Sequence, residues 1–378
     1  MRFEVSKTLD AIERRLSTDP ALARGVLDLA EVLRYVDLDN GGRPASLLRL
    51  GMVVDAHARL LAEENVPVYA VVDRKVLSDQ DLTSNERMVI RRWGDDGIVE
   101  VLEKPEDRVP EVAELTGLPV LSRQAFEGWR DRYGWLGTEP GRLLAPVAGH
   151  GGAAMVARVP GTPSSPPRPG GPPVLQRVWQ CPEPSCGTFG RGRVGRPGGQ
   201  RPPRIRGGAP VCPKHDGRLT DAGPRPPAEV MTIRVDGVVR QRFVVAGDQP
   251  VVVGRAPDGP HQAPGTLVLG HWLTEEARRW ISRSHVRLDL RGTDLVVRDT
   301  STNGTVIRRG GSMAEPDRLV LTRDQARLLA DGDVIELYPG VQVARARDGL
   351  TGAGVEEPAS VMSDAPTMSI RLPNAGRP

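Results

Sequence analysis

The sequence predicts a multidomain protein: an N-terminal α/β domain with a parallel sheet, a small cysteine-containing segment and a C-terminal all-β sandwich. Three observations support this. Strand-like and helical patterns alternate up to about residue 145, three cysteines and a Pro/Gly-rich stretch follow, and short strand-like runs fill most of the last third. A chain of 378 residues is long enough for two or three domains. The composition shifts divide it into residues 1–145, a linker at 146–175, the cysteine segment at 176–222, the sandwich at 228–346 and a tail at 347–378, which is expected to be disordered.

The composition excludes several classes of function. A formal charge of +3 is close to neutral for this length, so no overall preference for nucleic acid or membranes follows. The first residues are charged, and no run of apolar residues is long enough to cross a bilayer. We therefore expect a cytoplasmic protein with no membrane partner. Most basic residues are arginine, which is typical of a GC-rich genome.

The N-terminal part contains four runs with the composition of buried strands, separated by helical patterns. The expected strands are Val32–Val36, Val66–Val72, Ile98–Leu102 and Leu118–Leu121. Between them, residues 45–64 repeat apolar positions with a helical period. Thr83 and Glu86 form the pattern of a capping box, and Gly117 is placed to end a helix that begins after Asp107. Strands alternating with helices predict a parallel sheet with three right-handed crossovers.

Acidic residues recur where these expected strands end. They are Asp37, Asp39, Asp73, Glu106 and Asp107. Ligands of parallel α/β sheets bind beyond the carboxyl ends of the strands, and converging carboxylates are suited to a hard cation such as Mg²⁺. The alternative is that these acids are ordinary helix caps and turn residues.

Two short motifs in this part resemble the NYN/PIN-like ribonuclease domains. The first is the run at residues 35–40, in which Asp37 is followed three residues later by Asn40, and the second is the run at residues 120–124. The resemblance implies a metal-dependent ribonuclease that uses Mg²⁺ or Mn²⁺ on RNA, with Asp37, Glu106 and Asp107 as tentative catalytic residues. That family usually has an acid at the position of Gln124. The missing carboxylate favours a degenerate domain without hydrolytic activity.

The cysteine segment contains two pairs of potential metal ligands. Cys181 and Cys186 form one pair, and Cys212 and His215 form the other. Three thiolates and an imidazole match a closed tetrahedral zinc site, and the proline-containing turns allow both members of a pair to face one ion. The segment resembles a zinc ribbon with a structural ion. The alternative is three free thiols and an unrelated histidine.

The insert between the two pairs, residues 187–210, contains several arginines and no acid. A flexible arginine-containing segment can bind phosphate backbones electrostatically. The alternative is a solvated loop. Because stacking aromatics are nearly absent from the insert, the sequence favours the loop.

The last third contains short strand-like runs separated by turn signals, as in antiparallel sandwiches. Met231–Val235 and Arg242–Val245 flank an Asp-Gly turn, which predicts a hairpin. The further expected strands are Val251–Val253, Val286–Leu290, Asp294–Arg298, Thr305–Ile307, Val334–Leu337 and Val341–Ala344.

Three motifs on loops between these strands carry groups suited to a phosphate and to the peptide that bears it. They are Gly254-Arg255, the run at 282–285 and the run at 301–305. An arginine binds phosphate through charge-assisted hydrogen bonds, hydroxyl groups donate to the remaining oxygens, and an asparagine amide can bond a peptide backbone. The order of the motifs resembles that of forkhead-associated (FHA) domains of bacterial, actinobacterial-like type.

The resemblance implies a β-sandwich that binds phosphothreonine peptides, with a role for each matching position. Five residues would contact the ligand: Arg255, Ser282, Arg283, Thr302 and Asn303. Gly254 and Gly304 would permit tight turns, and His285 would brace the loops internally.

Two classes of function follow from these patterns. The first is an adaptor that binds a phosphothreonine-containing partner downstream of a Ser/Thr kinase. The second is a metal-dependent ribonuclease that its FHA domain localises. A scaffold without either activity is a third reading. The tail also offers Thr367, followed three residues later by Ile370, as a self-ligand for the FHA site in cis or in a second copy.

Overall fold

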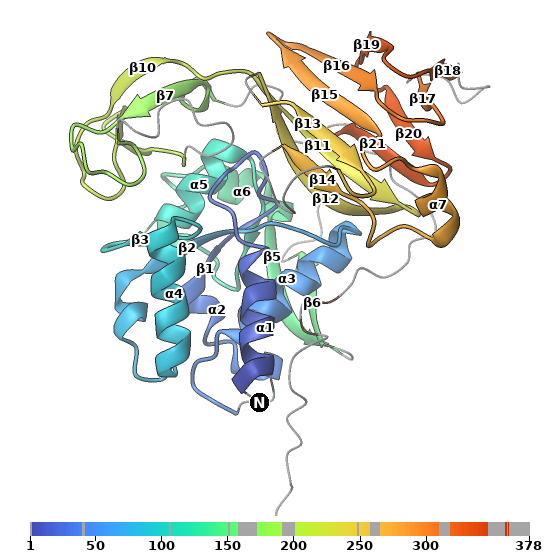
Figure 1. Ribbon diagram of the computed structural model, residues 1–378. Coiled ribbons are helices and arrows are strands. Elements are labelled where there is room, and N and C mark those ends of the chain that lie inside the picture. Colours follow the sequence, from blue (N-terminus) through green and yellow to red (C-terminus); the bar gives the residue numbers. More distant parts are fainter. Residues whose placement is uncertain are drawn as a thin grey trace, which may run out of the picture.

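The computed structural model describes residues 2–39, 42–105, 107–149, 152–157, 172–190, 201–247, 249–257, 265–309 and 318–346, together with positions 360 and 362 (Figure 1). Within these residues the chain forms an α/β domain, a small segment with short strands, and a β-sandwich. No helix in these ranges combines the length and apolar character needed to cross a membrane.

The N-terminal domain is built on one sheet with the strand order β3-β2-β1-β4-β5-β6. Its strands are β1 (Val26–Asp28), β2 (Tyr69–Asp73), β3 (Glu100–Leu102), β4 (Val120–Leu121), β5 (Leu143–Gly149) and β6 (Gly152–Ala157). Strands β1 to β5 pair in parallel, and β6 runs antiparallel to β5. The expected parallel-sheet α/β region is thus confirmed. The sheet also extends through β6 into residues expected to be linker.

Helices cover both faces of this sheet (Figure 1). They are α1 (Arg2–Glu13), α2 (Leu29–Val32), α3 (Leu48–Leu61), α4 (Ser84–Asp96), α5 (Arg108–Thr116) and α6 (Trp135–Thr138). Leu27 and Val72 belong to a core with α1, α3 and α4, whereas Val26 and Val71 belong to a second core with α5 and α6. Alternate strand residues point to opposite faces, so a short, wholly apolar strand supplies both cores.

The expected first strand, Val32–Val36, is wrong. The first strand is β1, and its last residue Asp28 caps α2 by accepting a hydrogen bond from Ala30 N at 2.8 Å. Residues 32–36 instead continue from α2 toward a 3₁₀ helix that begins at Val36. A five-residue run in which four residues are apolar does not distinguish a buried helix from a buried strand, and the helix cap at Asp28 decides this one.

Local signals elsewhere in the domain are confirmed. Thr83 and Glu86 form the capping box at the start of α4. Gly117 ends α5 with φ 75°, a left-handed conformation that glycine adopts without strain. Strands β2, β3 and β4 lie within or at the ends of the runs expected for them.

The middle segment consists of short antiparallel pairs. Strand β7 (Arg177–Gln180) pairs with β10 (Thr220–Pro224), and β8 (Arg204–Arg206) pairs with β9 (Ala209–Val211). The three cysteines pack there with Phe189 and Leu219 in a small core of their own.

The C-terminal domain is a sandwich of two sheets, with the orders β12-β11-β21-β20-β17-β18 and β14-β13-β15-β16-β19. Its strands are β11 (Ala228–Val235), β12 (Val238–Ala246), β13 (Val251–Gly254), β14 (Thr266–Val268), β15 (Val286–Arg291), β16 (Asp294–Asp299), β17 (Thr305–Arg308), β18 (Arg318–Leu321), β19 (Ala326–Leu328), β20 (Val334–Tyr338) and β21 (Val341–Arg345). Alternating apolar residues of both sheets form one core between them. The expected strands and the hairpin are confirmed, whereas β14, β18, β19 and the helix α7 (Glu275–Trp280) were not expected.

The α/β domain and the sandwich are in direct contact. Glu63 forms a parallel bridge with Val239 of β12, and its carboxylate binds the Arg242 guanidinium at 2.6 and 2.9 Å. Next to it, Glu64 pairs with Arg240 at 2.9 Å. Both carboxylates are largely buried. The two ion pairs therefore hold β12 of the sandwich against the first domain.

Two residues of the expected disordered tail lie against the first domain. Met362 N donates a hydrogen bond to Asp55 Oδ2 at 3.2 Å, and Ser360 Oγ also binds that carboxylate. The Met362 side chain packs over Gly51, at a place where a Cβ atom would come within 2.6 Å of the sulfur. Thr367 and Ile370, proposed from the sequence as a self-ligand, lie outside the described residues.

Candidate functional site

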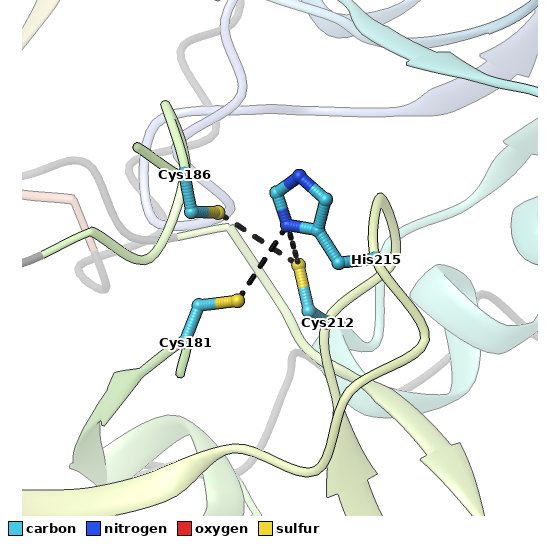
Figure 2. A group of neighbouring side chains, drawn as sticks. All are labelled: Cys181, Cys186, Cys212 and His215. Carbon is cyan, nitrogen blue, oxygen red and sulfur yellow. Dashed lines mark hydrogen bonds between the residues drawn. The ribbon is translucent and has the colours of Figure 1, made fainter. Parts of the chain in front are cut away.

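The four potential metal ligands of the middle segment converge (Figure 2). The Sγ and Nδ1 atoms of Cys181, Cys186, Cys212 and His215 all lie within 4.8 Å of one another. The sequence pairing is therefore realised in space, and the cluster has the donor atoms and spacing to bind a metal ion. The three cysteines are free and buried.

Each ligand pair sits on a turn whose backbone is directed at sulfur. Phe189 N donates to Cys186 Sγ at 3.3 Å, and the amides of Lys214 and His215 bond to the Cys212 sulfur. Gly190 is required in the first turn, because a Cβ there would lie 2.4 Å from the Cys186 carbonyl oxygen. Burial raises the pKa of the Cys212 thiol to about 12, whereas the amides act to lower it. A bound cation would stabilise the thiolate form that burial disfavours.

Among the described residues, the acids expected at the strand ends of the first domain do not form a group that could hold a metal ion. Asp37 is exposed and makes a bidentate pair with Arg123 at 2.7 and 2.8 Å, which lowers the pKa of its carboxyl group. Asp39 pairs instead with the buried Arg49 at 3.0 Å. Glu106 lies outside the described residues.

Asp107 is fully buried and serves as the centre of an ion-pair network. Its carboxylate accepts a hydrogen bond from Tyr133 Oη at 2.7 Å and binds Arg204 at 2.7 Å and Arg132 at 2.6 Å. Burial acts to raise the pKa of Asp107, but the tyrosine hydroxyl and the arginine charges outweigh it and lower the pKa. This carboxylate is therefore occupied by structural partners.

Arg204 belongs to the insert that was expected to be a solvated loop or a nucleic-acid contact. The structure describes residues 187–190 and 201–210 of that insert, and the second part contacts the first domain. Arg201 donates to the carbonyl oxygens of Gly97 and Val99, and Arg108 of α5 donates to those of Pro202 and Pro203. The expectation of a fully solvated loop is wrong for these residues. Residues 191–200 lie outside the described part of the chain.

The structure also places at the sheet edge an acid that sequence reasoning missed, Asp28. It ends β1, and Asp73, which was expected at a strand end, ends the adjacent parallel strand β2. Burial, together with the charges of Glu31 and Asp73, raises the pKa of Asp28 to about 6. The signal was present, because the run Val-Leu-Asp at 26–28 precedes a helical pattern. Glu31 is occupied by Ser122 Oγ and Arg123 N.

In the sandwich, three loops with the expected phosphate-binding residues meet at one end of the strands. Arg255 N donates to the Ser282 carbonyl oxygen at 3.1 Å, which joins the loop after β13 to the loop before β15. Ser282 Oγ accepts a hydrogen bond from Thr302 N at 3.1 Å and so joins the third loop. The structure thus brings Arg255, Ser282 and Thr302 together from residues spaced far apart in the sequence.

His285 lies beneath these loops and is fully buried. Its Nδ1 accepts from Ser282 N at 3.1 Å, and its Nε2 faces the Gly304 carbonyl oxygen at 3.2 Å. Burial lowers the pKa of His285, which keeps the imidazole neutral with Nε2 as the donor. All of these contacts are internal, so the ring braces two loops.

The remaining expected contact residues are on the surface. Arg283, Thr302 and Asn303 are exposed. Asn303 Nδ2 donates to the Trp280 carbonyl oxygen at 2.7 Å, and its Oδ1 can act as an acceptor. Trp280 itself is an exposed large side chain, 48% accessible.

Two observations point to an anionic ligand in this region. The Nε atom of Arg255 is buried and has no hydrogen-bond partner among the described residues. Gly254 allows the arginine loop to approach closely, because a Cβ at this position would lie 1.9 Å from the Arg283 carbonyl oxygen. Gly304 has φ 84°, the left-handed conformation expected of a tight turn.

No family model matches the chain, and no curated protein matches it. The chain is similar to several solved structures of FHA domains. The MEK1 FHA domain is 28% identical, with a TM-score of 0.23, over 32% of this chain and 88% of that one. The FHA domain of human APLF in complex with an XRCC1 bisphospho peptide is 20% identical, with a TM-score of 0.22, over 30% of this chain and 97% of that one.

A third similar structure is the FHA domain of an Arabidopsis thaliana hypothetical protein. It is 19% identical, with a TM-score of 0.23, and the match covers 34% of this chain and 92% of that one. About a third of the chain is thus similar to solved FHA domains, the family that the sequence motifs resemble. The zinc-ribbon and NYN/PIN resemblances stay predictions.

Proposed function

We propose that the C-terminal sandwich binds a phosphothreonine-containing peptide and that the protein acts as an adaptor for a partner phosphorylated by a Ser/Thr kinase. The observation that carries this proposal is the pairing of Arg255 with Ser282. Arg255 has a buried Nε–H without a partner among the described residues, and its backbone is bonded to Ser282. The TM-scores are low, so the proposal rests on this loop geometry.

The loops supply a distinct kind of bond to each part of such a ligand. Arg255 gives the phosphate charge-assisted hydrogen bonds. Ser282 Oγ already accepts from Thr302 N, so its hydroxyl hydrogen is available to a phosphate oxygen. Asn303 Oδ1 can accept a backbone N–H of the peptide, because its amide nitrogen is held by Trp280. Only a phosphorylated ligand therefore supplies the hydrogen-bond acceptors that the Arg255 guanidinium requires.

The test is a binding titration of the whole chain with matched peptides that carry threonine or phosphothreonine. We expect only the phosphorylated peptide to bind. Arg255→Ala is expected to weaken binding by about a hundredfold through the loss of charge-assisted bonds. Arg291→Ala is the matched control, because Arg291 is an exposed arginine at the far end of β15. Equal affinities of both peptides, or equal affinities of the two arginine variants, would disprove the proposal.

The partner is identified by a pull-down with the same proteins. Wild-type protein and Arg255→Ala are each incubated with cell extract before and after phosphatase treatment. A partner that depends on phosphorylation binds only wild type in untreated extract. A protein retained under all four conditions does not bind through this site.

We further propose that the Cys/His cluster holds a structural zinc ion. Zn²⁺ binds sulfur at about 2.3 Å and imidazole nitrogen at about 2.0–2.1 Å, which in a regular tetrahedron separates two sulfurs by about 3.8 Å and sulfur from nitrogen by about 3.6 Å. Cys186 and Cys212 sulfurs are 3.8 Å apart, and His215 Nδ1 lies 3.5 and 3.6 Å from the sulfurs of Cys181 and Cys212. With four protein ligands, no coordination position is open for chemistry.

The ribonuclease alternative stays a prediction from sequence resemblance. Of its tentative catalytic residues, Asp37 and Asp107 are each engaged by arginines, and neither shares a partner with the other. An arginine salt bridge competes with a divalent cation for the same carboxylate oxygens. No contact of the described residues favours hydrolysis over binding.

A further inference from the structure

A cavity lies directly beside the phosphate-binding arginine. Its volume is about 220 Å³, and it is lined by Arg255, Ala256, Gly270, His271 and Arg278. A water molecule takes about 30 Å³ in the liquid, so the cavity has room for several water molecules. Its volume is therefore larger than a single phosphate group requires. None of the motifs recognised in the sequence includes Gly270, His271 or Arg278.

Three elements bring these residues together. The loop after β13 carries Arg255, the turn after β14 carries Gly270, and α7 carries Arg278. Gly270 N donates to the Arg255 carbonyl oxygen at 3.1 Å, and a Cβ on Gly270 would lie 2.6 Å from that oxygen. Arg278 Nη2 donates to the Gly270 carbonyl oxygen at 2.7 Å. Glycine thus allows the two arginine-bearing segments to close around one space.

The two arginines are incompletely satisfied. The Nε atoms of Arg255 and Arg278 are both buried without a hydrogen-bond partner among the described residues. A buried donor without a partner is destabilising, so positions of this kind favour a ligand that accepts the bond. Among the described residues, no carboxylate lines the cavity.

Two acids of the described residues lie close to residues of the lining or next to it. Glu275 contacts Arg278 Nη1 at 3.3 Å, but its side chain is 78% exposed, and exposed pairs of this kind contribute little. Glu64 of the first domain does not line the cavity and accepts a hydrogen bond from Trp272 Nε1 at 3.5 Å. The lining therefore combines two positive charges with a histidine, a set suited to anions.

We propose that this cavity is a second anionic subsite, which takes a carboxylate or a second phosphate that the peptide carries near its phosphothreonine. The inference rests on the proposed function of the same loops. Arg255 and Ser282 hold the phosphothreonine, and Arg278 selects peptides that bear a further negative group.

The experiment uses the whole chain and four kinds of peptide. They carry unmodified threonine, phosphothreonine with neutral neighbours, phosphothreonine with glutamate at each neighbouring position in turn, and phosphothreonine with phosphoserine at those positions. At the preferred position, the added negative group is expected to raise affinity about five- to tenfold. The glutamate and phosphoserine series distinguish a carboxylate from a phosphate as the natural group.

Arg278→Gln is expected to abolish this gain and to weaken binding of the neutral-flanked phosphopeptide much less than binding of the peptides with an added negative group. Arg279→Gln is the matched control, since the neighbouring arginine is exposed and does not line the cavity, and it should keep the gain. Arg278→Lys should retain part of it. Equal midpoints of urea unfolding for the variants and the wild type check that the protein is intact.

The outcomes separate this inference from the proposed function. If the unmodified peptide binds as well as the phosphothreonine peptide, the proposed function fails and the inference falls with it. If phosphothreonine binds but no added negative group raises affinity, only the second subsite is disproved. If Arg278→Gln weakens all phosphopeptides equally, Arg278 contacts the phosphothreonine itself and the second subsite is again disproved.

Discussion

Arg204 Nη2 lies 2.7 Å from Asp107 Oδ1, and this ion pair joins the segment between the metal ligands to the α/β domain. Both side chains are buried, and Asp107 is fully so. A residue that the sequence suggested for catalysis thus holds two parts of the protein together. A neutral side chain at this position would leave the surrounding guanidinium groups without their counter-charge.

Asp107→Asn is expected to loosen residues 201–206 from the first domain. Breaking a buried pair by removing one partner costs about 3–5 kcal/mol. Faster amide hydrogen exchange in residues 201–206 of Asp107→Asn than of wild type would show that this segment is loosened. The control is Asp221→Asn, which breaks the Arg177 pair, where both side chains are 41% exposed. Equal exchange in the two variants would contradict the structural role of Asp107.

Removal of the metal is expected to unfold the middle segment. A chelator should make Cys181, Cys186 and Cys212 accessible to a thiol reagent, because the proposed ion would hold together the small core in which they pack. Metal analysis should find one zinc per chain in wild type and none in Cys212→Ser. Protected thiols in metal-free protein, or full zinc content in the variant, would be inconsistent with this site.

Gly254→Ala is expected to abolish phosphopeptide binding. The added Cβ would lie 1.9 Å from the Arg283 carbonyl oxygen and 2.7 Å from its carbon, so the backbone of one loop must move. Displacement of this kind costs about 1–3 kcal/mol and separates Arg255 from Ser282. Gly247→Ala is the control in the same sandwich, because its Cβ would meet only Leu290 O at 3.6 Å. A titration with the phosphothreonine peptide compares the two, and unchanged affinity in Gly254→Ala would refute the need for close approach.

His57 is expected to make the first domain sensitive to acid. Its ring is fully buried, and burial lowers its pKa from 6.5 to about 4. The unfolded chain therefore takes up a proton at a higher pH than the folded chain, and stability falls as the pH drops from 6.5 toward 4. The full effect is about 3 kcal/mol.

His57→Gln lacks this group and serves as the comparison. Wild type should lose stability relative to the variant on acidification from neutral pH to about pH 5, measured by the midpoints of urea unfolding. A constant difference between the two midpoints across this range would show that His57 is not buried in its neutral form. Asp28 also has a raised pKa, but it is present in both wild type and His57→Gln. Its contribution to the pH dependence of stability therefore cancels when the two proteins are compared.

The short-range signals of the sequence predicted local structure well. The capping box at Thr83 and Glu86 and the helix end at Gly117 depend on hydrogen bonds between residues a few positions apart. The apolar run at 32–36 misled because helix and strand both bury such residues, and the deciding cap at Asp28 lies outside the run.

By itself, the sequence determined the composition and order of the candidate sites: the arginine, hydroxyl and asparagine loops, and the set of three cysteines and one histidine. These are motifs in which the chemistry is carried by residues at fixed short spacings. The tertiary structure decided which distant groups become neighbours. It joined Asp107 to Arg204, separated Asp37 from Asp107, and placed Arg278 of an unexpected helix beside Arg255. The physical reason is that the order of the strands in a sheet and the conformation of the loops determine which distant residues come into contact. Neither produces a recognisable pattern of residue spacings in the sequence.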